Sequence, residues 1–209
     1  MKNITIIDYG LGNIQSLYNT LKFLGYSPLF YSQEKKINSN ICILPGVGAF
    51  NHAMKLLKEE KIDLDLKNFI KNENNLLIGI CLGMQLFFDE SSENLKTSGL
   101  GIIKGKVEQL NLKNDDIVPN VGWFKTLINT SGNLKYLNQF NKQKFYYVHS
   151  YVAEIQKKKN QIATSNYNDR NFCAMATNNI NVMGTQFHPE KSSKIGLEFL
   201  NILIKNSIN

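Results

Sequence analysis

Short apolar runs, each followed by a glycine-containing loop and then by a helical pattern, recur through the first half of this chain. They are ITII at 4–7, ICIL at 41–44 and LLIGI at 76–80. Strands that are apolar along their whole length are buried on both faces, as in a parallel sheet whose strands are connected by covering helices. The pattern therefore predicts an α/β fold with a mostly parallel central sheet flanked by helices.

The pattern changes after residue 105, where strand-like segments follow one another without helices between them. These segments are KVEQL, FYYVHSYV, QIATSNY, FCAMATN and VMGTQF. They predict antiparallel strands added in the C-terminal half. A last helix is predicted over 192–206, because Ile195, Phe199 and Leu203 share one helical face. No internal repeat or linker interrupts the chain, so we expect one domain over residues 1–209.

Charge and hydropathy restrict the classes of partner. The 24 Lys and Arg against 17 Asp and Glu give a net charge of +7, which is compatible with a nucleic acid or an acidic ligand. The one basic cluster, Lys157–Lys159, lies between two predicted strands and indicates a solvated turn, so we expect no nucleic acid. No apolar stretch is long enough for a membrane span, and the run after Asn3 is too short for a signal peptide. We expect a cytoplasmic protein.

Three cysteines, Cys42, Cys81 and Cys173, are an odd number and show no CxxC spacing. This argues against a disulfide framework and against a structural zinc site. Cys81 differs from the other two because it lies in GICLG, between Gly79 and Gly83. That spacing is the cysteine counterpart of the GxSxG elbow, which holds a nucleophile on a sharp strand-to-helix turn. The amide of Leu82 would then face an oxyanion. A buried, unreactive cysteine remains the alternative.

The segment GTQFHPEKS contains a possible base for Cys81. In an extended segment His188 and Glu190 project from the same side, so Glu190 can hold one ring nitrogen while the other accepts a proton from Cys81. Taken alone, HPE also fits a surface turn. A zinc site of Cys81, His188 and Glu190 is conceivable but ranks below the triad, because no further His or Cys lies near them in sequence.

A third loop, LPGVGAF at 44–50, follows a predicted strand. Its two glycines around Val47 give a backbone able to turn the amide of Val47 or Gly48 toward an oxyanion, although a plain turn is equally compatible with the pattern. The other histidines are less suggestive. His149 lies among aromatic residues and is better interpreted as a hydrogen-bonded strand histidine than as a base, and His52 as solvated.

In combination these motifs resemble a known family. GICLGMQLFF and GTQFHPEKS resemble the class I glutamine amidotransferases, in which a Cys, His and Glu triad hydrolyses glutamine. Within that family, IDYGLGNIQSL, LPGVGAF, YYVHSY and FHPEKSS resemble the glutaminase subunits of imidazole glycerol phosphate synthases, from histidine biosynthesis. The resemblance extends from residue 4 to about residue 204, and several ordered motifs are far more specific than one GxCxG.

The resemblance implies a role for each matching residue. Cys81 would be the nucleophile, His188 the general acid and base, and Glu190 its orienter. The oxyanion would be bound by the amides of Leu82 and of Val47 or Gly48. The remaining matches are the glutamine contacts Gln85, His149, Ser150 and Tyr151, and the partner-facing residues Asn13, Trp123 and Lys191. No cofactor or metal is implied.

The resemblance also implies L-glutamine as substrate and a (β/α)8 cyclase as the partner in a heterodimer. Ammonia would pass to the cyclase, which makes imidazole glycerol phosphate and AICAR. Trp123 is either an interface anchor or a core residue. One departure keeps the partner open: VPNVGWF replaces the usual VPHIGWN, and Asn120 and Phe124 are expected to remove polar interface contacts. A paralogous subunit that serves a sugar-nucleotide amidating synthase is therefore an alternative, and a DJ-1-like thiol hydrolase is a weaker one.

Overall fold

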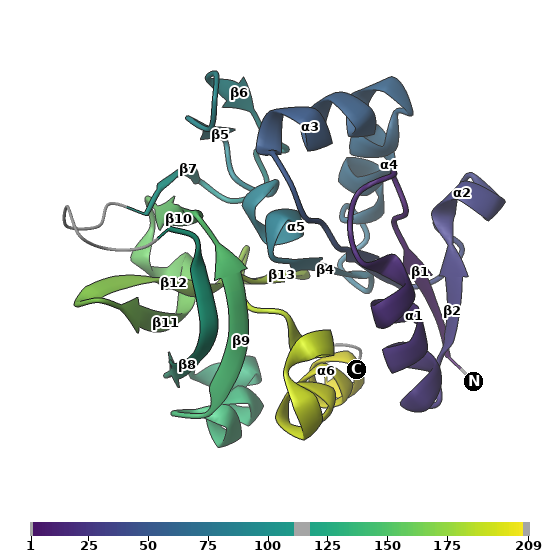
Figure 1. The fold of residues 1–209 in the computed structure, drawn as a ribbon. Coiled ribbons are helices and arrows are strands. Elements are labelled where there is room, and N and C mark those ends of the chain that lie inside the picture. Colours follow the sequence, from purple (N-terminus) through teal and green to yellow (C-terminus); the bar gives the residue numbers. More distant parts are fainter. Residues whose placement is uncertain (1, 111–117, 207–209) are drawn as a thin grey trace.

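The computed structural model describes residues 2–110 and 118–206, which are built around a nine-stranded sheet between two layers of helices (Figure 1). From one edge to the other, the strands are β2 (Ser27–Phe30), β1 (Asn3–Ile6), β3 (Ile41–Leu44), β4 (Leu76–Ile80), β13 (Val182–Thr185), β12 (Arg170–Thr177), β11 (Gln161–Tyr167), β8 (Asn120–Ile128) and β9 (Lys144–His149). From β2 to β13 neighbouring strands pair in parallel. From β13 to β9 they pair antiparallel. The predicted fold class is confirmed.

The parallel strands form where the apolar runs predicted them. Every residue of β3 and of β4 is buried, as expected for strands covered on both faces. Successive side chains of β3 enter different cores, because Ile43 packs in one apolar cluster and Cys42 in the other. The two clusters are therefore the two faces of one sheet.

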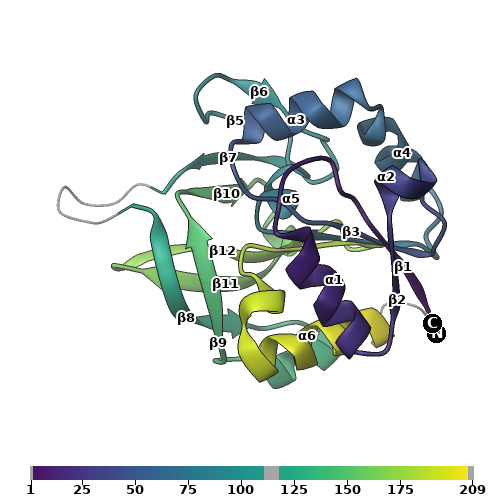
Figure 2. The same cartoon turned by 45° about the vertical axis from the view of Figure 1, so that its right-hand side comes forward.

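Helices cover both faces (Figures 1 and 2). On one face lie α1 (Ile14–Phe23) and α6 (Ser193–Asn206), and on the other α3 (Phe50–Glu59) and α4 (Ile62–Phe69). The last predicted helix is thus confirmed as α6. The shorter elements are α2 (Tyr31–Glu34), α5 (Leu82–Gln85) and the 3-10 helices η1 (Gly132–Phe140), η2 (Lys158–Asn160) and η3 (Pro189–Lys191). Lys157–Lys159, predicted to be a solvated turn, is exposed at η2. None of the described helices is long and apolar enough to cross a membrane.

A second, four-stranded sheet lies beside the first in the described structure. Its order is β10 (Tyr151–Ile155), β7 (Gly105–Gln109), β5 (Glu90–Ser91) and β6 (Thr97–Ser98). The chain passes from one sheet to the other at Ser150, between β9 and β10. The sequence predicted a single strand-like segment, FYYVHSYV, because the apolar alternation gives no sign of a change of sheet. The junction places His149, Ser150 and Tyr151 where the two sheets meet.

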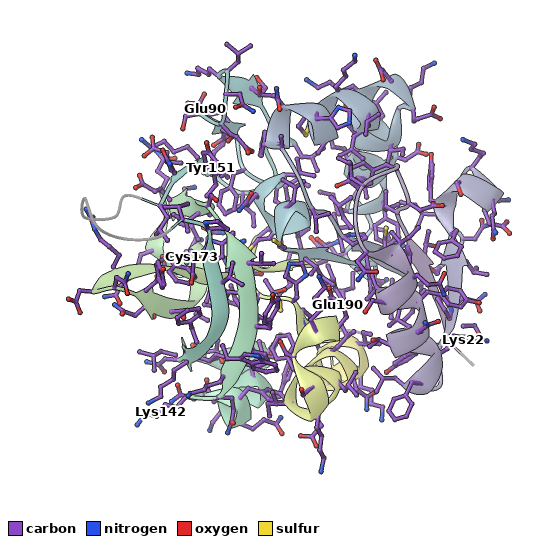
Figure 3. All side chains as sticks on the ribbon, viewed as in Figure 1. Lys22, Glu90, Lys142, Tyr151, Cys173 and Glu190 are labelled. Carbon is purple, nitrogen blue, oxygen red and sulfur yellow. The ribbon has the colours of Figure 1, made fainter. Side chains whose placement is uncertain are left out.

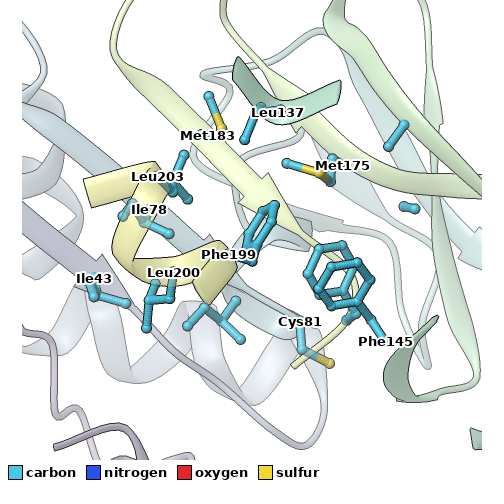
Figure 4. Packing of buried hydrophobic residues seen from close by; sticks show 14 of the residues in the cluster. Ile43, Ile78, Cys81, Leu137, Phe145, Met175, Met183, Phe199, Leu200 and Leu203 are labelled. Atoms are coloured by element: carbon cyan, nitrogen blue, oxygen red, sulfur yellow. The ribbon is translucent and has the colours of Figure 1, made fainter. Parts of the chain in front are cut away.

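An aromatic cluster joins α6 to the sheet close to Cys81 (Figure 4). Phe145 of β9 stacks on Phe187 with ring centroids 4.2 Å apart. Phe199 of α6 packs edge-on against both rings, at 5.4 and 5.2 Å. Edge-to-face and offset-stacked rings at these distances add to the free energy of apolar burial. The cluster therefore fixes the loop that leads from β13 to His188.

We expect Phe199→Ala to lower the free energy of unfolding by about 3–5 kcal/mol, because Phe199 is fully buried and its loss leaves a cavity beneath that loop. Phe23→Ala is the matched control, since Phe23 is 78% exposed on α1. Its effect should stay within about 0.5 kcal/mol. Urea denaturation measures both. Equal effects of the two substitutions would contradict the assigned packing.

Candidate active site

Cys81 lies on a strained turn between β4 and α5. Its backbone has φ 54° and ψ −110°, a conformation that non-glycine residues rarely adopt. The Cys81 amide donates to the carbonyl of Thr185 at 2.7 Å. A Cβ atom at Gly83 would lie 1.8 Å from the Leu44 carbonyl oxygen, and one at Gly79 would lie 2.6 Å from the Phe87 ring. The flanking glycines are thus needed for close approach, as the elbow motif predicted.

The helical pattern that follows Cys81 forms a short helix. α5 comprises four residues, Leu82–Gln85, and the chain then turns so that Leu86, Phe87 and Phe88 are all fully buried. Because such a run has no polar face, all of its side chains can be buried whether or not the helix continues. So short a helix has little dipole of its own. Leu82 lines the cavity at this turn, so its amide can face an oxyanion.

His188 and Glu190 form a buried pair. His188 Nδ1 donates to Glu190 Oε1 at 2.8 Å, and the side chains are 2% and 6% exposed. Glu190 lies just before α6, toward the interior (Figure 3). The contact between the two side chains matches the prediction, but the backbone conformation does not. Glu190 lies in the 3-10 turn η3, not in an extended segment. The bond fixes the ring tautomer and leaves Nε2 for a second partner.

The charge of His188 is coupled to Cys81. Burial opposes protonation, but the Cys81 thiolate and then the Glu190 carboxylate outweigh it and raise the pKa of His188 to about 10. Among the described residues Nε2 is buried without a hydrogen-bond partner. Cys81 Sγ itself lies 3.8 Å from the Val148 carbonyl and 3.6 Å from Gln186 Nε2. Catalytic hydrogen bonds are often long before substrate binds, so these distances are compatible with a nucleophile beside its acid and base.

Cys81 opens into a cavity of about 450 Å³. The cavity wall contains every residue predicted to bind the oxyanion or glutamine: Val47, Gly48, Leu82, Gln85, His149, Ser150 and Tyr151, together with Ala49, Glu93 and Val148. A larger cavity of about 820 Å³, lined by Asn179 and Asn206 among others, contains none of the predicted residues. The smaller cavity is the candidate active site, since it suits a small polar ligand and contains the nucleophile.

The predicted oxyanion loop faces this cavity. Among the described residues, the amides of Val47, Gly48 and Leu82 donate to no other protein group. Gly48 has φ +103°, a backbone conformation that side chains rarely adopt, so the loop depends on glycine at this position. The loop can therefore offer an amide to a ligand held against Cys81.

Gln85 is held by its amide nitrogen. Gln85 Nε2 donates to the Tyr151 carbonyl at 2.9 Å and to Gln186 Oε1 at 3.0 Å. Both of its amide hydrogens are thus used within the protein. Its Oε1 has no partner among the described residues, so Gln85 can offer a ligand only an acceptor.

His149 is a structural histidine, as the sequence indicated. Its Nδ1 lies 3.1 Å from the Tyr151 carbonyl, which can only accept, so Nδ1 carries the hydrogen. Its Nε2 then accepts from Asn120 Nδ2 at 3.1 Å. Burial first, and the charge of His188 second, lower the pKa of His149 to about 4. The ring is therefore neutral near pH 7 and fixes the Tyr151 carbonyl.

The predicted interface residues differ in their surroundings. Trp123 is 43% exposed on β8, edge-on to Tyr146 at 6.1 Å, so its interpretation as a core residue is wrong. Asn13 is exposed and accepts from the Ser16 amide at 3.4 Å, at the start of α1. Lys191 is partly buried in η3.

Of the two departures in VPNVGWF, one is buried and the other is partly buried. Asn120 is fully buried, and Phe124 packs edge-on against Tyr147 and Tyr167. The loss of polar interface contacts at these two positions stays a prediction. The Asn120 side chain supports the cavity wall through its contact with His149.

Three residues near the site were missed from the sequence. Glu93 lines the cavity and accepts from the Phe50 amide at 2.7 Å. Tyr9 Oη is buried without a hydrogen-bond partner among the described residues, and burial and then the Cys81 charge raise the pKa of Tyr9. Gln186 contacts Cys81, and strand alternation with His188 was a signal that could have identified it.

Among the described residues, no group of three or more His, Cys, Asp or Glu side chains is arranged to hold a metal ion. This includes Cys81, His188 and Glu190.

Comparison with known proteins gives a family. The model of the family "Glutamine amidotransferase class-I" matches residues 5–202. A curated relative from Listeria monocytogenes, named imidazole glycerol phosphate synthase subunit HisH, is 41% identical over 94% of this chain and 92% of its own. The protein of the same name from Prochlorococcus marinus strain MIT 9312 is 40% identical over 99% of both chains.

The fold has solved counterparts. A chain in the structure of PurLQS from Thermotoga maritima superposes with a TM-score of 0.72 over 100% of this chain and 98% of that one, at 19% identity. A chain described as a glutamine amidotransferase gives 0.71 over 98% of each chain, at 17% identity. At such low identity these likenesses establish the fold alone.

We expect Cys81→Ala to lower the pKa of His188 by about one unit or more, and Glu190→Gln to lower it less, because the thiolate is the stronger of the two negative neighbours. Glu198→Gln on α6 is the control, since Glu198 contacts the exposed Lys194. NMR of the His188 ring carbon across the pH range measures the midpoint. An unchanged midpoint in Cys81→Ala would show that the two groups are not coupled.

Proposed function

This chain belongs to the class I glutamine amidotransferases and, within them, to the HisH subunits of imidazole glycerol phosphate synthase, and we propose that it hydrolyses L-glutamine with Cys81, His188 and Glu190. One observation carries the assignment of these residues: Cys81 opens into the cavity while the buried His188–Glu190 pair lies behind it, electrostatically coupled to the thiolate. The result is a nucleophile, an acid and base, and an orienting group in one place.

In the first half of the reaction, the Cys81 thiolate attacks the side-chain carboxamide carbon of glutamine. The carbonyl π electrons move to oxygen, and the amide of Leu82 with that of Val47 or Gly48 donates to the oxyanion. His188 then transfers its Nε2 proton to the departing nitrogen, the C–N bond breaks, and ammonia leaves. A γ-glutamyl thioester remains on Cys81.

In the second half, neutral His188 accepts a proton from water as the water oxygen attacks the thioester carbon. The C–S bond breaks, the thiolate returns, and glutamate leaves the cavity. Glu190 stabilises the imidazolium at both stages without itself accepting a proton. The backbone around His149, Ser150 and Tyr151 holds the α-amino and α-carboxylate groups of the substrate, and Gln85 Oε1 accepts from a donor on it.

We expect Cys81→Ala to abolish glutamine-dependent synthesis of imidazole glycerol phosphate by the chain bound to its cyclase subunit. An ammonium salt should still support this synthesis, because the substitution removes only the source of ammonia. Cys173→Ala is the control: Cys173 is a second buried free thiol, on β12, and its loss should leave glutamine use intact. Product formation from each nitrogen source is the measurement. Glutamine use by the Cys81→Ala variant would disprove the assignment of the nucleophile.

We further propose that ammonia passes to a (β/α)8 cyclase bound as a heterodimer. Two observations support this partner. The relatives are named as subunits of imidazole glycerol phosphate synthase. β8 also exposes three large apolar side chains, Val121, Trp123 and Leu127, at 51%, 43% and 47%, which suits a protein partner. The same names favour this partner over the paralogue that serves a sugar-nucleotide amidating synthase.

We expect Trp123→Ala to weaken binding of the cyclase subunit by about tenfold or more, since partly exposed aromatic residues often anchor interfaces. Leu64→Ala is the control, because Leu64 is 53% exposed on α4, distant from β8 in Figure 1. Isothermal titration calorimetry compares the two. Equal affinity for both variants would exclude Trp123 as an anchor.

A further inference from the structure

We propose that Gln186 donates a hydrogen bond from its side-chain amide to Cys81 Sγ and thereby stabilises the thiolate, and that Gln85 sets the orientation of this amide. This inference rests on the proposed role of Cys81 as nucleophile. It assigns a function to Gln186, the first residue after β13, and a second function to Gln85.

The contact to sulfur is buried. Gln186 is fully buried and Gln85 is 5% exposed, so water does not compete freely for their amides. Gln186 Nε2 lies 3.6 Å from Cys81 Sγ, a distance ordinary for a hydrogen bond to sulfur. The partner residues are 105 positions apart in the chain. A donor in this place favours the charged form of the sulfur over the thiol.

The orientation of the Gln186 amide follows from a fixed acceptor. The Tyr151 carbonyl can only accept, so the Gln85 atom that lies 2.9 Å from it must be the amide nitrogen. The same nitrogen lies 3.0 Å from Gln186, whose facing atom must then be the acceptor Oε1. Gln186 therefore has to direct its Nε2 hydrogens away from Gln85, toward the sulfur.

The acceptor itself is held in place. His149 donates to the same Tyr151 carbonyl from Nδ1, and Asn120 fixes the His149 tautomer by donating to Nε2. The resulting chain of contacts runs from the start of β8 to the nucleophile. Each link is a donor facing an acceptor, so a change at one end disturbs the orientation at the other.

Other groups also act on the sulfur. His188 is the nearby cation, supported by Glu190, and Tyr9 is a buried neighbour on the β1 side. His149 is neutral near pH 7, and Glu93 lies in the cavity wall. Gln186 differs from His188 because it stabilises the thiolate without a charge of its own. This leaves the His188 proton available for the departing ammonia.

The test is the pH dependence of Cys81 alkylation by iodoacetamide in the intact chain, followed by mass spectrometry of the Cys81 peptide. Gln186→Met keeps the volume and removes the donor, and Gln186→Glu keeps an acceptor for Gln85 but turns an oxygen toward the sulfur. We expect the midpoint of alkylation to rise by about one to two pH units in both, the size of a hydrogen bond to a charged group. Two variants protect the test against one failing to fold, which circular dichroism reports.

Thr177→Val is the matched control. It removes another buried side-chain hydrogen bond, from Thr177 Oγ1 to the Val182 carbonyl at 2.8 Å, and should leave the midpoint unchanged. Unchanged midpoints in the folded Gln186 variants would overturn the inference, as would an equal rise in Thr177→Val. The proposed function has its own test, because it fails if Cys81→Ala still hydrolyses glutamine. The two tests are independent, since the midpoint of alkylation does not depend on turnover.

Discussion

The parallel pairing of β4 with β13 is the constraint on which the site depends. Its register sets Ile80 opposite Thr185, and the bond from the Cys81 amide to the Thr185 carbonyl continues the ladder one residue beyond β4. Because both strands end at the same edge, the residues that follow them meet there. Cys81 follows one strand and His188 the other, so two segments distant in sequence build one site.

Close packing then holds the nucleophile in a conformation that its backbone would otherwise avoid. The positive φ of Cys81 has a conformational cost. Gly83 lies so close to the Leu44 carbonyl that a side chain would not fit there. Apolar side chains are also buried around α5 and pack against the turn. On the other side, the aromatic contact of Phe145 with Phe187 fixes the segment leading to His188. The site is thus held between two cores that the sheet separates.

The sequence predicted the fold class, and it predicted that the catalytic segments meet, because each segment lies directly after an apolar strand. That is a local pattern, which can be read from the sequence. It also predicted the His188–Glu190 contact, but from an extended segment where the structure has a 3-10 turn. It did not predict the change of sheet at Ser150, since alternation continues across it. Nor did it predict the amide chain from Tyr151 through Gln85 to Gln186, because those contacts join residues distant in sequence. Such contacts depend on tertiary structure and leave no periodic signal.

A covalent bond between Cys81 and glutamine during turnover is the step from which the rest of the proposed chemistry follows. Acid quenching of the complex during steady-state hydrolysis, followed by peptide mass spectrometry, detects that bond. We expect a γ-glutamyl thioester on the peptide that contains Cys81 and an unmodified thiol at Cys42 and Cys173. Glutamate formation with the adduct on another residue would contradict the proposed mechanism.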